Sequence, residues 1–81
     1  MSKVWEQNGF KFIIYPDDHT PSHVHVKKAG EEVVIELGSE DEPPDFRRGS
    51  IYMRDRDAYK ALEICYEKQE HLLSEWRRIH E

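Results

Sequence analysis

The stretch Val4-Trp-Glu-Gln-Asn-Gly-Phe-Lys-Phe-Ile-Ile-Tyr15 decides the fold, because two strand-like runs flank Asn8-Gly9 in it. Asn-Gly is the preferred pair for a two-residue type I′ turn, since both turn positions require a positive φ. Two further strand-like runs, at residues 23–28 and 32–37, surround a short glycine-bearing turn. The sequence therefore predicts a meander of about four antiparallel strands over residues 3–37, made of two β-hairpins.

A long C-terminal helix is predicted over residues 55–80. Apolar and adaptable residues recur there in alternating steps of four and three, which places them on one helical face: Ala58, Leu62, Cys65, Gln69, Leu72, Trp76 and Ile79. Residues 38–50 combine Pro43-Pro44 with dense negative charge and are interpreted as an acidic loop, although residues 46–53 leave a short last strand open. We expect one α+β domain spanning residues 1–81, with the sheet packed on the helix.

The length of this helix bears on oligomeric state. A helix of about 26 residues is about 39 Å long, whereas a compact domain of this size has a radius of gyration of about 12 Å. An overhanging end would expose Leu72, Trp76 and Ile79 as an apolar stripe, which usually marks an interface. A kinked helix that folds back is the alternative. The first interpretation favours a homodimer or a small partner protein bound through this stripe and Tyr15.

Composition narrows the class of protein. The net charge of −5 argues against nonspecific binding to nucleic acid, although a local basic patch stays open. No apolar run approaches the roughly 20 residues that span a bilayer, and the first residues lack the apolar stretch of a signal peptide. We therefore expect a soluble cytoplasmic protein without a membrane partner. Cys65 is the lone cysteine and is interpreted as a core residue.

Three of the five histidines lie within seven residues, at His19, His23 and His25. Imidazole titrates near neutral pH and is the commonest metal ligand, so such a cluster indicates proton transfer, metal binding or a pH-sensitive contact. On a strand, alternate side chains share a face, so His23, His25 and Lys27 point one way and the intervening valines point toward the helix. The other two histidines, on the predicted helix, are interpreted as surface residues.

In the metal hypothesis, His23 and His25 supply two nitrogens from one strand face. His19 or Asp18 folds back from the proline-bounded loop as a third ligand, and water takes the fourth position of an open site. Lys27 on the same face opposes a bound cation. No cofactor is expected on this basis, and a divalent metal stays as an alternative.

In the catalytic hypothesis, the imidazoles of His19, His23 and His25 act as acid and base on an RNA or nucleotide phosphodiester, and Lys27, Lys11 or Arg47 stabilises developing negative charge. Whether the protein is an enzyme is left open, because no separate nucleophile or glycine-rich phosphate loop is visible. In the structural hypothesis, His19 bonds within its loop and the strand histidines fill the outer face of the sheet.

The string Asp18-His-Thr-Pro-Ser-His-Val-His-Val26, which follows Gly9-Phe-Lys-Phe-Ile-Ile-Tyr15, resembles a small prokaryotic family called domain of unknown function 4160. Trp76, near the end of an amphipathic tail, adds to the resemblance. The family often has two prolines before the second histidine, where this chain has Pro21-Ser22. The resemblance implies a protein-binding component of a toxin–antitoxin-like pair, and this is the leading functional prediction. It implies no specific reaction.

Overall fold

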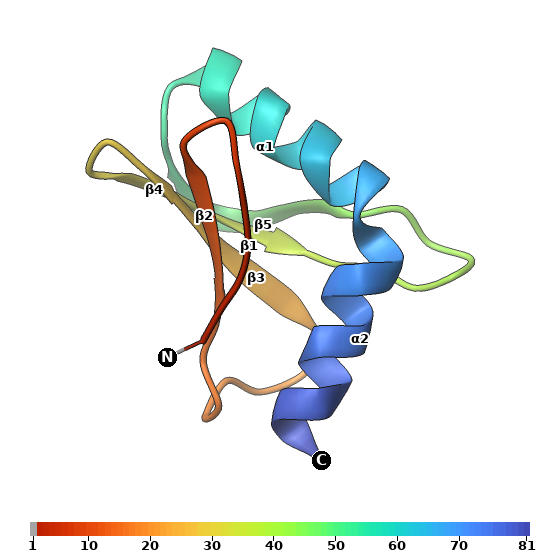
Figure 1. Cartoon of the computed structure of the whole chain (residues 1–81). Coiled ribbons are helices and arrows are strands. Elements are labelled where there is room, and N and C mark those ends of the chain that lie inside the picture. Colours follow the sequence, from red (N-terminus) through yellow and green to blue (C-terminus); the bar gives the residue numbers. More distant parts are fainter. Residues whose placement is uncertain (1) are drawn as a thin grey trace.

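In the computed structural model, which describes residues 2–81, five strands precede two helices (Figure 1). The elements are β1 (Ser2–Gln7), β2 (Phe10–Ile14), β3 (His23–Lys28), β4 (Glu31–Glu36), β5 (Asp45–Tyr52), α1 (Asp55–Glu67) and α2 (Gln69–His80). The strands form one sheet in the order β1-β2-β3-β4-β5, with every neighbouring pair antiparallel. The predicted α+β class is confirmed, with five strands instead of about four and two helices instead of one.

Both predicted hairpins are present. Asn8 and Gly9 have φ values of 52° and 81°, and Ala29 and Gly30 have values of 50° and 82°. Positive φ at both positions is what a type I′ turn requires. The turns set the pairing of β1 with β2 and of β3 with β4, and thereby fix which side chains of β3 face the helices.

The fifth strand shortens the acidic loop predicted over residues 38–50, and it is the short last strand left open over residues 46–53. β5 begins at Asp45 and pairs with the outer side of β4, in register at Phe46 with Ile35 and at Ile51 with Val33. An irregularity in the pairing separates these two points. Because β5 is an edge strand with mostly exposed residues, it lacks the alternating apolar pattern that identifies a half-buried strand.

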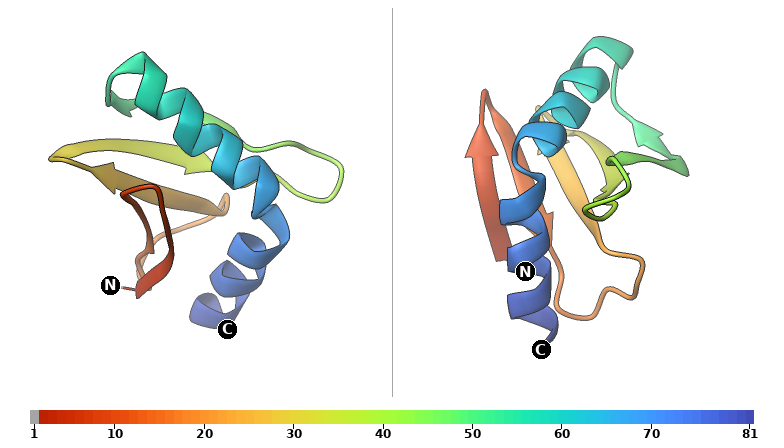
Figure 2. Two further views of the ribbon diagram at one scale, coloured as in Figure 1. Left: turned by 45° about the horizontal axis from the view of Figure 1, so that its top comes forward. Right: turned by 90° about the vertical axis from the view of Figure 1, so that its right-hand side faces the viewer.

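The predicted single helix bends at Lys68, which has φ −111° and ψ 19°. The Lys68 N–H still donates to the Ile64 carbonyl, and the Leu72 N–H donates to the Lys68 carbonyl, each at 2.9 Å. Figure 2 shows α2 turning away from the direction of α1 so that both helices follow the same side of the twisted sheet. The longest extent of the molecule is 33 Å, shorter than the continuous helix would be.

The side chain of Gln69 fixes this bend to the loop after β4. Its Nε2 lies 2.9 Å from each of three backbone carbonyl oxygens, which share its two N–H hydrogens; they belong to Leu37, Ser39 and Glu42. Gln69 is part of the helical stripe predicted from sequence. Its polar head therefore joins α2 to the loop, and the apolar residues that follow turn toward the sheet.

Because of the bend, the stripe predicted to be exposed is covered within this chain. Leu72 is fully buried, Trp76 is 7% exposed, and Ile79 packs half-buried against the same core. The overhanging helix is therefore wrong, and the folded-back alternative is correct. The homodimer and the small partner protein stay predictions without this stripe as support.

One face of the sheet and the inner faces of both helices form the core. Its fully buried residues include the predicted Phe10, Phe12, Ile14, Val24, Val26, Val33, Ile35 and Leu37. Cys65 lies in this core as predicted, and burial raises the pKa of its thiol to about 12. Within residues 2–81, neither helix has the length and apolar content needed to cross a membrane.

Candidate functional site

Strand β3 brings His23 and His25 together on one face of the sheet, as the strand alternation predicts. Their ring centroids are 5.4 Å apart, while Val24 between them is fully buried on the other side. His25 stands in register between Ile13 of β2 and Val34 of β4. These two neighbours are buried, so His25 rises from an apolar row of the sheet.

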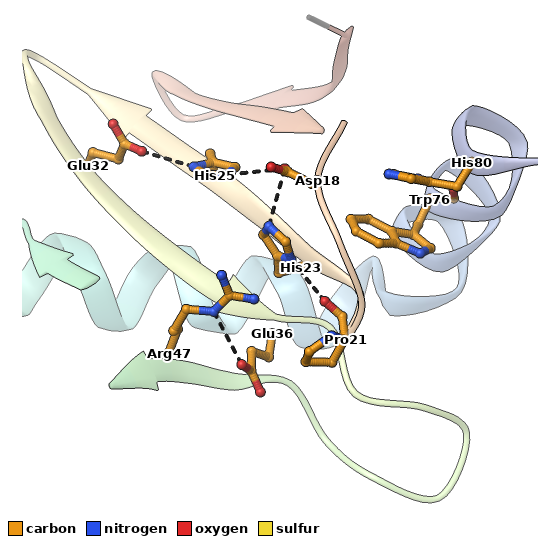
Figure 3. A network of polar contacts seen from close by, with 9 residues as sticks. All are labelled: Asp18, Pro21, His23, His25, Glu32, Glu36, Arg47, Trp76 and His80. Carbon is orange, nitrogen blue, oxygen red and sulfur yellow. Dashed lines mark hydrogen bonds and ion pairs between the residues drawn. The ribbon is translucent and has the colours of Figure 1, made fainter. Parts of the chain in front are cut away.

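The loop between β2 and β3 places Asp18 against both rings. The Asp18 N–H donates to the Tyr15 carbonyl at 3.1 Å, which folds the loop back just after β2. Asp18 Oδ2 then lies 3.2 Å from His23 Nε2 and 3.2 Å from His25 Nε2. Figure 3 shows this carboxylate between the two imidazoles. The facing ligand atoms of the three residues all lie within 4.8 Å of one another.

The second nitrogen of each ring has its own partner. His23 Nδ1 lies 2.9 Å from the Pro21 carbonyl oxygen, and His25 Nδ1 lies 3.0 Å from Glu32 Oε2. A carbonyl or carboxylate oxygen only accepts, so each contact requires the proton on Nδ1. When the rings are neutral, each Nε2 therefore carries a lone pair that points toward the Asp18 oxygen. That oxygen is also an acceptor, so no hydrogen lies between it and either Nε2.

Aromatic rings enclose one side of this cluster. His23 is 3% exposed and its ring lies 5.2 Å from that of Trp76, which stacks on His80 at 3.8 Å (Figure 3). The Tyr15 ring meets His25 edge-on at 4.7 Å. Burial lowers the pKa of His23, although its bond to the Pro21 carbonyl acts in the opposite direction.

The other side of the cluster opens onto a groove of about 610 Å³. The three residues of the cluster line it together with residues of the β2–β3 loop, the end of β4 and β5: Asp17, His19, Thr20, Pro21, Glu36, Arg47 and Arg48. Arg47 Nε donates to Glu36 Oε2 at 3.3 Å. The cluster is therefore shielded by Trp76 on one side and accessible from solvent on the other.

The structure separates the residues that the histidine hypotheses grouped together. His23 and His25 meet, but His19 is exposed on the groove wall and is not one of the three converging residues. Lys27 lies over the Tyr15 ring, 6.0 Å from its centroid, and lines a different depression. A hydrogen bond to Tyr15 raises the pKa of Lys27.

The sequence did not predict three residues of this site, namely Glu32, Arg48 and His80. Glu32 is one, although the predicted hairpin brings it near His25 from the neighbouring strand. Arg48 lies on β5, a strand that the sequence leaves open. His80 corrects the interpretation as a surface residue: it is half-buried, and its Nε2 is buried without a hydrogen-bond partner among residues 2–81. Asp18, weighed as an alternative to His19, takes the third position.

Comparison with known proteins gives a family and no relative of known activity. No curated protein matches the chain, and no solved structure does. A family model described as a domain of unknown function (DUF4160) matches residues 9–77, which include the converging cluster and the Trp76 that covers it. The match spans most of the chain, which therefore belongs to the DUF4160 family.

Proposed function

We propose that this protein binds one divalent transition-metal ion through Asp18, His23 and His25. The observation that carries the proposal is the convergence of two imidazole Nε2 atoms on one carboxylate oxygen while both Nδ1 atoms have acceptors of their own. Metal-ligating histidines usually donate the other ring N–H to a carboxylate or a backbone carbonyl. Glu32 and the Pro21 carbonyl supply these two kinds of acceptor.

Two of the three distances between the proposed ligand atoms suit a metal centre of ordinary size. Two ligand atoms bound at about 2.1 Å to a tetrahedral zinc ion lie about 3.4 Å apart. Each Nε2 lies 3.2 Å from Asp18 Oδ2, close to that separation. Two imidazoles and one carboxylate are a ligand set used by zinc and by iron(II) in open sites. The groove side leaves room for water or another ligand.

Among the neighbouring charges, Glu32 favours a cation at the cluster and the guanidinium of Arg47 opposes one. Lys27 opposes a bound cation less than the sequence indicates, because its ammonium lies over Tyr15 and lines a separate depression. Glu32, in contrast, is hydrogen-bonded to His25, and its negative charge faces the imidazole. A carboxylate behind a ligating histidine increases the basicity of the ring and fixes its orientation. Of the two third ligands predicted from the sequence, His19 and Asp18, the proposed set contains Asp18.

The test is calorimetric titration of tag-free protein with Co²⁺ and Zn²⁺, after treatment with a chelator that is then removed. We expect a stoichiometry of about one metal ion per chain and a loss of affinity of at least about 100-fold in His25→Gln. His19→Gln and His71→Gln are matched controls that keep wild-type affinity. Wild-type protein that binds neither metal, or a His19→Gln loss equal to that of His25→Gln, would refute the proposal.

A further inference from the structure

The groove beside the proposed metal centre contains a pair of arginines from β5. Arg47 and Arg48 both line it, together with residues of the β2–β3 loop that carries Asp18. Arg47 uses its Nε for Glu36, at 3.3 Å, and this contact holds the guanidinium at the groove. Its two terminal nitrogens remain as donors of a planar fork that suits oxyanions.

The charge of this groove depends on the metal. Its lining contains three carboxylates, on Asp17, Asp18 and Glu36, and two guanidinium groups, on Arg47 and Arg48. With neutral histidines the formal charge is −1, so an anion is repelled by the metal-free groove. A divalent ion changes the sum to +1 and adds a Lewis-acidic centre at the groove wall. Anion binding should therefore be weaker in the metal-free groove than in the metal-loaded one.

We propose that the metal-loaded groove binds the phosphate group of a small phosphate ester, between the metal ion and the Arg47–Arg48 pair. This inference rests on the proposed metal site. A phosphate carries up to two negative charges and several acceptor oxygens, so it can contact a metal ion and two guanidiniums at once, whereas a carboxylate offers only two oxygens. The volume of about 610 Å³ exceeds the need of a phosphate alone and leaves space for an organic group.

The metal and the phosphate should strengthen each other's binding. Coupling between two ligands is reciprocal, so phosphate must raise metal affinity by the factor by which metal raises phosphate affinity. We expect a factor of about ten or more, since the charge of the groove changes sign. A loss confined to phosphate binding is expected when the arginines are removed, because neither is among the three proposed metal ligands.

The experiment uses the full chain loaded with one equivalent of Co²⁺ and titrated with inorganic phosphate, a nucleoside 5′-monophosphate and acetate. The Arg47→Ala, Arg48→Ala double variant should lose phosphate affinity about tenfold or more while its Co²⁺ stoichiometry stays unchanged. Arg77→Ala removes an exposed arginine outside the groove and serves as the control. Circular dichroism verifies that the double variant is folded.

The results separate the two proposals. Tighter binding of the monophosphate than of inorganic phosphate supports a phosphate ester as the ligand. Equal binding of both would show that the groove recognises the phosphate group alone, and would overturn the choice of an ester. Co²⁺ binding without phosphate binding, equal phosphate affinity in metal-free protein, or acetate binding as tight as phosphate would each overturn the inference and leave the metal site standing. Absence of Co²⁺ binding would instead refute the metal proposal.

Discussion

Replacing Gln69 by leucine should destabilise the fold through the bend between α1 and α2. The Gln69 amide donates to three carbonyl oxygens of the loop after β4, and leucine has a similar volume but no donor. The substitution therefore removes hydrogen bonds without opening a large cavity. Because Gln69 is only half-buried, the expected loss comes mainly from the acceptors left behind.

The size of the loss follows from the burial of those acceptors. Leu37 is fully buried, so water cannot replace the amide at its carbonyl. Ser39 and Glu42 are exposed, and water can bond to theirs. One buried carbonyl without a partner costs about 1–3 kcal/mol, which gives an expected loss of about 2 kcal/mol in the free energy of unfolding. For a domain of this size that corresponds to a decrease of about 8–16 °C in melting temperature.

Urea denaturation followed by circular dichroism measures this quantity directly. We expect a lower midpoint for Gln69→Leu with an unchanged slope, since the surface exposed on unfolding stays the same. Glu70→Gln, at the exposed neighbouring position, should stay within about 0.5 kcal/mol of wild type. A Gln69→Leu protein as stable as Glu70→Gln would refute the role given to this amide.

Three further predictions concern the cluster and its surroundings. Glu32→Gln should lower Co²⁺ affinity about 10- to 100-fold in a chelator competition assay, because the His25 ring loses a charged acceptor; an equal loss in Glu31→Gln would contradict this positioning role. Trp76→Ala should cost about 3–5 kcal/mol in urea denaturation, since the ring is 7% exposed and packs on His23; a loss under about 1 kcal/mol would contradict its place in the core. In chelator, burial keeps the pKa of folded His23 below its ordinary value of 6.5, so its stabilising contribution is complete above that value and decreases as the pH falls toward the folded pKa. Denaturation at a series of pH values should show this decrease in wild type and less of it in His23→Gln, and an identical pH dependence in both proteins would contradict it.

Local rules were sufficient for the part of the fold that holds the two strand histidines. Asn8-Gly9 determines a turn because of the φ values it tolerates, and the strand alternation determines which side chains share a face. These rules depend only on neighbouring residues. They correctly placed His23 and His25 together and the valines of β3 in the core.

The features that the sequence did not reveal depend on contacts between distant segments. Lys68 lies in an unbroken helical pattern, so the sequence gives a kinked helix only as an alternative and does not place the bend at this residue. The β2–β3 loop folds back so that Asp18, and not His19, lies beside the rings of His23 and His25. The spacing of residues does not specify this fold of the loop. The sequence left β5 open without deciding it, because an edge strand needs no apolar alternation. Arg48 and the groove that it lines could therefore not be predicted.

The most direct measurement is anomalous X-ray scattering from crystals of tag-free protein grown with one equivalent of Zn²⁺. The metal proposal predicts one strong peak at about 2.0–2.2 Å from a carboxylate oxygen of Asp18 and from Nε2 of His23 and His25, with Nδ1 of His25 still bonded to Glu32. Crystals with no peak at this position, or with the zinc bound by His19, His71 or His80 instead, would contradict it.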